Sequence, residues 1–190
     1  MKIEDPLDFF EDDMSFWTKL AEHAREQKEM QRMVLSSVGT EGKPQLRTMI
    51  LRSLKPREKT LFFYTDSRSD KVEQWQKKPF CEALAYSHSN LMQLRLSGNI
   101  KILEQGDLFD QAKDGLVPHQ HKDYNSKLAP GSIYDSSQAG LSETLNFALV
   151  QLQVEHLEIL VLQPKGSEHF RWSYQYDKEG HLLKSTRLVP

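Results

Sequence analysis

Hydrophobic and polar residues alternate most regularly over residues 91–103. The apolar positions of this segment are Met92, Leu94, Leu96, Ile100 and Ile102. Such alternation predicts a strand with one buried face, because successive side chains of a strand point to opposite sides. Gly98 lies inside the pattern, and we expect a bend or a bulge there. A strand of this length is typical of a barrel.

Shorter segments with apolar and β-branched residues, separated by polar turns, predict further strands. They cover residues 33–38, 45–54, 59–65, 80–87, 155–164, 169–177 and 182–189. Residues 142–153 carry a pattern that fits either a helix or a strand after Phe147. Strands joined mostly by hairpins favour an antiparallel barrel.

Helical spacing is clearest over residues 14–32, where apolar residues fall on one face and charges on the other. Shorter helices are predicted over 67–78, which Pro79 ends, and over 105–114. Residues 115–140 have little periodicity and are expected to form a long loop. The chain therefore reads as a single mostly β domain over residues 1–190, an antiparallel split β-barrel with peripheral helices.

Composition narrows the function classes. The 190 residues include 38% hydrophobic and 27% charged residues, which is ordinary for a soluble globular domain. The formal net charge of −2 does not indicate a nucleic-acid partner. No long apolar run predicts a membrane span, and the acidic start of the chain lacks the apolar core of a signal peptide, so we expect a cytoplasmic protein. Cys81, the single cysteine, is expected to be a buried structural thiol.

Several kinds of chemistry lack their usual sequence signals. The chain has no glycine-rich dinucleotide or P-loop motif and no G-x-S-x-G nucleophile turn. His119 and His121 stand in a polar segment without neighbouring cysteines or glutamates, and no metal site is expected from them.

An anion site is better supported, at the turn between strand 59–65 and helix 67–78. Ser67–Lys71 brings hydroxyls and cations to the start of a helix, where unpaired N–H groups and a partial positive charge attract anions. Arg47 and Arg52 on the preceding strand could add guanidinium groups. Ordinary helix capping with solvated surface charge explains the same residues equally well. The two arginines are five residues apart, so both reach one ligand only if the strand bends or the ligand wraps across its end.

Asp70 is the unexpected member of this turn. It follows Ser67 by three residues, which is the spacing of a capping box. It either closes the start of the helix or lies beside the anion, where its charge would weaken binding.

The chain resembles the pyridoxamine 5′-phosphate oxidase-like family through a set of short motifs in the family's order and approximate spacing. The motifs are RTMILR (47–52), YT (64–65), SDK (69–71), QLRLSG (93–98), HFR (169–171) and RLVP (187–190). The resemblance covers about residues 33–190. It implies an FMN-binding split barrel that forms a homodimer, with FMN at the subunit interface and two equal sites.

The resemblance also implies roles for residues around the FMN phosphate. Arg47 and Lys71 would bind the phosphate, with Ser69 nearby. The family's usual arginine beside the phosphate lysine is Asp70 here, and Arg68 on the same turn is the candidate for the missing cation.

Other residues would hold the rest of the cofactor. Met49 and Ile50 would face the flavin ring through their backbone, and Arg171 would come from the other subunit. The complete set of implied cofactor-binding residues is Arg47, Met49, Ile50, Arg52, Tyr64, Thr65, Arg68, Ser69, Lys71, Gln93 and Arg171. Of these, Tyr64 and Thr65 would line the phosphate and ribityl region, and Gln93 would reach the edge of the isoalloxazine.

The substrate side departs from the family. Arg52 and His169 are the candidates for orienting the substrate, but the usual arginine two residues before His169 is Ser167. The family's late tryptophan aligns near Val161. The tyrosine, arginine and serine that hold the vitamin's phosphate in true oxidases fall at Gln111, Gly115 and His119, with Lys113, His121, Lys122 and Tyr124 nearby. The chain therefore resembles the broader oxidase-like branch.

The expected function is that of an FMN-binding oxidoreductase acting on an unidentified small substrate, without an assigned catalytic acid or base. One alternative is an authentic pyridoxamine or pyridoxine 5′-phosphate oxidase with a rearranged substrate loop. Another is a non-catalytic flavin- or haem-binding module, in which His88 or His169 would be the axial ligand. The substrate, the electron acceptor and the pathway stay open.

Overall fold

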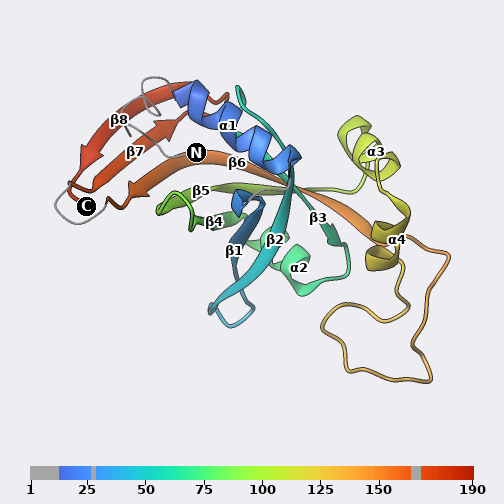
Figure 1. Cartoon of the computed structure of the whole chain (residues 1–190). Helices are drawn as coiled ribbons and strands as arrows, with labels where there is room; N and C mark the ends of the chain where they lie inside the picture. Colours follow the sequence, from blue (N-terminus) through green and yellow to red (C-terminus); the bar gives the residue numbers. More distant parts are fainter. Residues whose placement is uncertain (1–12, 27–28, 164–167) are drawn as a thin grey trace.

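The computed structural model describes residues 13–26, 29–163 and 168–190, and it forms one antiparallel sheet that curls into a barrel (Figure 1). The strands are β1 (Arg32–Val38), β2 (Pro44–Lys55), β3 (Thr60–Asp66), β4 (Phe80–Ser87), β5 (Met92–Leu103), β6 (Phe147–Val161), β7 (Phe170–Tyr176) and β8 (Leu182–Leu188). The helices are α1 (Asp13–Arg25), α2 (Asp70–Lys77), α3 (Asp107–Asp114) and α4 (Pro118–Tyr124). Among the residues described, no helix is long and apolar enough to cross a membrane.

Strand β6 closes the barrel. The sheet order is β3-β2-β1-β4-β5-β6-β7-β8, and an additional pairing joins β3 to β6. The first half of β6 pairs with β3 from Phe147 to Gln153, and its second half pairs with β7 from His156 to Val161. Strand β5 pairs along both halves. Six strands therefore form the barrel and β7–β8 extend from it, which confirms the predicted split barrel.

A bulge marks the point where β6 changes neighbours. Ser97 pairs with His156 but Gly98 pairs with Val154, so Glu155 is the extra residue. A Cβ atom on Gly98 would lie 1.9 Å from the carbonyl oxygen of Gln153. Only glycine allows this approach, and the bulge expected at Gly98 is confirmed.

Two apolar clusters flank the sheet. The larger fills the barrel and reaches under α1, which lies across β2 and β6 in Figure 1. The smaller lies outside β3 and β6, beneath α3 and α4, and consists of Phe62, Phe109, Leu116, Tyr124, Phe147 and Leu149. Cys81 belongs to the larger cluster, and burial raises the pKa of its thiol to about 11, as expected for a structural thiol.

A buried lysine fixes α1 to the barrel. Lys59 is 2% exposed and pairs with Asp13 of α1 at 2.9 Å. Its ammonium lies 5.5 Å from the ring centre of Trp17 and 5.3 Å from that of Tyr176, and the Trp17 indole donates to the Tyr176 hydroxyl. The charge is thus matched by a carboxylate and two aromatic faces, which offsets its desolvation.

Four predicted boundaries are wrong. The helix predicted over 14–32 ends at Arg25, and Glu29–Gln31 forms a short 3-10 turn that inserts Met30 into the core; residues 27–28 lie outside the described part. Helix α4 occupies part of the predicted loop 115–140. Residues 147–161 of the predicted segments 142–153 and 155–164 form one continuous strand, β6, whose alternation is interrupted by the bulge; residue 164 is not described. The helix predicted from residue 67 begins at Asp70, since Ser67 bonds to Asn146.

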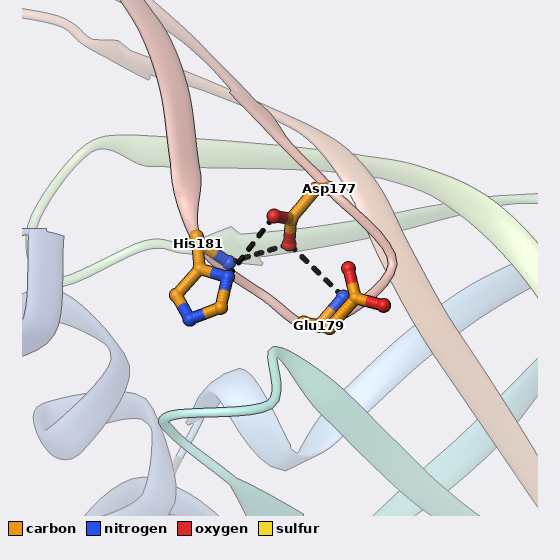
Figure 2. Close-up of side chains that lie close together, drawn as sticks. All are labelled: Asp177, Glu179 and His181. Atoms are coloured by element: carbon orange, nitrogen blue, oxygen red, sulfur yellow. Dashed lines mark hydrogen bonds and ion pairs between the residues drawn. The ribbon is translucent and has the colours of Figure 1, made fainter.

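The β7–β8 turn gathers Asp177, Glu179 and His181 close together (Figure 2). The Asp177 carboxylate accepts the backbone N–H groups of Glu179 at 2.9 Å and His181 at 2.8 Å, and contacts the His181 ring at 3.0 Å. These bonds, the His181 backbone bond above all, lower the pKa of Asp177. The contacts are those of an exposed hairpin turn.

We expect Gly98→Ala to lower the free energy of unfolding by about 3 kcal/mol, because the new methyl group must displace the β6 backbone. Urea unfolding followed by circular dichroism measures the loss. Gly115→Ala is the matched control, since Gly115 has an ordinary φ of −77° and its nearest neighbour would be 3.3 Å from the new atom. Equal stability of the two variants would contradict the role given to Gly98.

Candidate functional site

The turn between β3 and α2 contains a buried hydroxyl without a partner. Ser69 is the N-cap of α2 and is 6% exposed, yet its side chain makes no capping bond. Its Oγ is buried and has no hydrogen-bond partner. An N-cap serine ordinarily accepts an N–H of the first helical turn, and buried polar atoms are ordinarily bonded. The Ser69 hydroxyl is therefore available to a ligand.

Two cations stand at the same turn. Burial lowers the pKa of Lys71, and the nearby charge of Arg47 lowers it further. Arg47 comes from β2, donates to the carbonyl of Leu35 at 3.2 Å, and lies 5.5 Å from the ring centre of Trp75. Within the described residues, neither cation forms an ion pair with a carboxylate. Two partly buried like charges beside a helix start and an unbonded hydroxyl are features that suit an anion, and they make this turn the candidate anion site.

Gln74 orients Arg47, a role that the sequence did not indicate. Its carboxamide oxygen accepts from the Ser37 hydroxyl at 2.5 Å and from Arg47 at 3.4 Å, and its nitrogen donates to Gln45 at 3.0 Å. Gln74 is 7% exposed in the middle of a short helix. No motif marks such a residue, because its partners come from strands β1 and β2.

Arg52 forms a second cationic site on the other side of the strand. The β2–β3 register shifts between Leu51 and Ser53, so β2 bulges at Arg52. The guanidinium lies 5.4 Å from the ring centre of Tyr64. Burial raises the pKa of Tyr124 in α4, and the nearby charge of Arg52 partly counteracts this rise. Its Nε is buried without a partner. Arg47 faces α2 while Arg52 faces α4, so the two arginines diverge as their spacing predicts, although the strand does bend.

These two sites differ from the other buried or partly buried cations, which pair with carboxylates. Lys59 pairs with Asp13, Arg68 with Asp66 at 2.7 Å, and Arg171 with Glu158 at 3.0 Å. Each of those carboxylates is largely buried, so the charges cancel within the protein. Arg47, Lys71 and Arg52 lack that compensation among the described residues, which is the pattern expected where a ligand supplies the negative charge.

Asp70 is the first residue of α2 and is exposed. It is therefore not the third helical residue that a capping box with Ser67 requires, and that prediction is wrong. Its charge still acts favourably on the helix start and raises the pKa of Lys71.

The remaining predicted residues divide into two groups. Met49 is buried in the barrel, while Ile50, Tyr64 and the inward Thr65 lie on β2 and β3 near the two cationic sites. Gln93 and Arg171 flank Leu160 across β5, β6 and β7, on the far side of β1 and β4 from Arg47. One chain thus does not bring the two groups together.

His169 and Arg171 are held by local contacts. His169 accepts the backbone N–H of Gln163 through Nδ1 at 3.0 Å, so the neutral ring carries its proton on Nε2. Arg171 keeps its Nε buried and without a partner despite the ion pair with Glu158. Ser167 lies outside the described residues.

Comparison with known sequences identifies relatives that share about a third of their matched residues with this chain. Residues 14–104 match the family model of the pyridoxamine 5′-phosphate oxidase FMN-binding domain. A pyridoxine/pyridoxamine 5′-phosphate oxidase of Psychrobacter cryohalolentis is 32% identical over 127 residues, covering 67% of this chain and 53% of that one. One from Legionella pneumophila strain Lens is 33% identical over 136 residues, covering 70% and 58%. The chain spans about half the length of these relatives.

Comparison with solved structures identifies the same fold. An FMN-binding protein related to pyridoxamine 5′-phosphate oxidase, from Nostoc punctiforme, superposes with a TM-score of 0.72 at 21% identity, covering 91% of this chain and 95% of that one. PhzG from Burkholderia lata, solved with tetrahydrophenazine-1-carboxylic acid, also gives 0.72, at 19% identity, covering 92% and 90%. At these identities the likeness concerns the fold.

Inorganic phosphate tests the Ser69–Lys71 anion site. We expect it to raise the thermal midpoint of the wild-type protein by mass action. The rise should shrink as the pH increases toward the ordinary lysine pKa of 10.5, because phosphate stays a dianion there while Lys71, its pKa lowered by burial and by Arg47, loses its proton earlier than an ordinary lysine. Lys71→Gln should show a smaller rise without this pH dependence. Lys78→Gln, an exposed position of the same helix, is the control and should behave as wild type. An unchanged response in Lys71→Gln would contradict the site.

Proposed function

Because the chain belongs to the pyridoxamine 5′-phosphate oxidase-like family, we propose that it binds FMN and acts as a flavin-dependent oxidoreductase on a small substrate. The observation that carries the proposal is the Ser69 hydroxyl, buried and unbonded beside two cations that have no carboxylate partner among the described residues. A flavin phosphate would fill this site.

The residues present fit an FMN phosphate. Ser69 would donate its hydroxyl, Lys71 and Arg47 would neutralise the dianion, and the first N–H groups of α2 would complete the cradle. Gln74 and Ser37 would hold Arg47 in place. Tyr64, Thr65 and the backbone at Met49 and Ile50 follow on the two strands that lead away from the phosphate. When bound, FMN supplies hydride transfer.

Arg52 is the best candidate for orienting the substrate. Its guanidinium lies over the ring of Tyr64 with Tyr124 nearby, and its free Nε can donate to an anionic or carbonyl oxygen. His169 is the second candidate, since its Nε2–H is available as a donor. Gln111, Gly115 and His119 are exposed on α3 and α4 and supply no arginine. This supports a member of the broader branch over an authentic pyridoxamine phosphate oxidase.

A homodimer would complete the site. Gln93 and Arg171, which the family resemblance assigns to FMN, lie away from Arg47 within one chain. An exposed apolar patch lies between them on the outer face of β2 and β4, and its members are Leu46, Phe80, Leu84 and Tyr86. We propose that a second copy covers this patch and brings its Arg171 to the flavin.

Ser69→Ala separates cofactor binding from stability. We expect the dissociation constant of FMN to rise about tenfold or more, as for a lost bond to a charged group. The free energy of unfolding without FMN should not fall, since the hydroxyl has no partner to lose. Flavin fluorescence quenching and urea unfolding measure the two quantities.

Ser87→Ala is the matched control for Ser69→Ala. Ser87 is also buried, but its hydroxyl donates to Glu29 at 2.6 Å, so the control should lose about 1 kcal/mol of stability and keep its FMN affinity.

In the wild type, bound FMN should bleach with dithionite and recover in air. A protein that neither quenches FMN nor releases a flavin on denaturation would refute the proposal, and a Soret band would favour haem.

The dimer proposal predicts that Leu84→Glu shifts the protein from dimer to monomer, because burying the new carboxylate in an apolar interface is costly. Light scattering after gel filtration measures the mass. Leu183→Glu is the control, an exposed leucine of β8 outside the patch. A wild-type monomer, with or without FMN, would exclude this interface.

A further inference from the structure

The segment between α4 and β6, residues 125–146, is closed by a narrow neck. Lys127 donates its backbone N–H to Gly140 at 2.9 Å, Ser142 donates to Asn125 at 2.6 Å, and Ser126 and Leu141 form an isolated β-bridge. Beyond the neck the chain projects from the barrel as a wide loop (Figure 1). We call the six paired backbone positions 125–127 and 140–142 the neck of this loop.

The neck is attached to the turn that precedes α2. Arg68 donates from Nη2 to the carbonyl of Ser126 at 2.9 Å and from Nη1 to that of Lys127 at 3.2 Å. Next to this contact, Ser67 donates its backbone N–H to Asn146 at 3.0 Å. The turn therefore holds both sides of the loop's base.

Asp66 fixes Arg68 in this position. Its carboxylate, whose side chain is 3% exposed, accepts from Nε at 3.0 Å, from Nη2 at 2.7 Å and from the Arg68 backbone N–H at 2.9 Å. These bonds and those to the neck use donors on all three guanidinium nitrogens. Arg68 thus faces a carboxylate and two carbonyls, which leaves little capacity for a cofactor phosphate.

The Asp66–Arg68 pair lies between the two cationic sites. On one side, Arg68 is followed directly by Ser69, whose buried hydroxyl has no hydrogen-bond partner. On the other side, Asn146 donates its N–H to the carbonyl of Tyr124 at 2.6 Å, and the Arg52 charge lies near the Tyr124 side chain. Hydrogen bonds therefore connect the turn to the neck and, through Asn146, to Tyr124.

We infer that Arg68, held by Asp66, is a positioning residue that couples occupancy of the phosphate site to the order of the neck and of Tyr124. This inference rests on the proposed FMN binding. Anion binding at Ser69 and Lys71 fixes the turn, the fixed turn holds the neck, and an ordered neck in return favours binding. The cofactor would in this way help to build the substrate side at Arg52.

Hydrogen exchange of the full chain, with and without FMN, tests the coupling. In the wild type, FMN should slow exchange several-fold at the first turn of α2 and also at the neck amides of Lys127 and Ser142. In Arg68→Met, FMN should still protect α2 but no longer the neck, which should exchange faster even without FMN. Arg187→Met, which breaks an ion pair with Glu168 at 2.9 Å on β8, is the control and should match the wild type.

A second variant guards against misfolding. Arg68→Met leaves Asp66 buried without its partner, which is destabilising, so Asp66→Asn with Arg68→Met removes both charges together and should give the same exchange pattern. If the neck of either variant still gains protection with FMN, the inference is overturned while FMN binding stands. If the wild type binds no FMN, the proposed function fails and the coupling with it. If the variants without FMN then also show the same neck exchange as the wild type, Arg68 does not hold the neck in place.

Discussion

The architecture depends on one strand that must pair with three neighbours. Strand β6 meets β3, β5 and β7, and the change from β3 to β7 is possible only where the bulge opposite Gly98 lets the backbones approach within a distance that no side chain tolerates. Its first half draws β3 into the barrel, so the β3–α2 turn lies at the barrel's edge. Its second half carries β7, with Arg171, out of the barrel. The separation of the two candidate half-sites follows from this geometry.

Cations with a structural role have a carboxylate partner within the protein, whereas the cations of the candidate sites have none among the described residues. Lys59 and Arg68 each meet an acidic side chain, and in both cases the pair joins segments distant in sequence: α1 to the barrel, or the α2 turn to the neck. Arg47 and Arg52 meet carbonyls, an amide or aromatic rings instead, and Lys71 forms no ion pair with a carboxylate among the described residues. Composition alone does not reveal this difference, since all five are ordinary basic residues of a nearly neutral chain.

Local patterns predicted what local forces determine. Alternation identified the strands and a lone glycine identified the bulge, because both depend on backbone geometry. The candidate anion site stays a prediction, and the start of α2 lies two residues after the expected one, with Ser69 and not Ser67 as its cap. Helix α4, the role of Gln74 and the contact of Arg68 with Ser126 and Lys127 were missed, since the contacts of Gln74 and Arg68 reach residues distant in sequence. Strand β6 was divided in two because its bulge breaks the very alternation that marks a strand.

The late position of β6 in the chain has a consequence for biosynthesis. Strands β1–β5 are translated first, and they form a sheet whose two outer strands, β3 and β5, both await β6. Until Val161 has left the ribosome, that sheet keeps two open edges, the state in which β-proteins are most prone to associate wrongly. The nascent chain therefore depends on rapid completion or on chaperones over this interval, and a ribosome that stalls before β6 leaves an open sheet and no barrel.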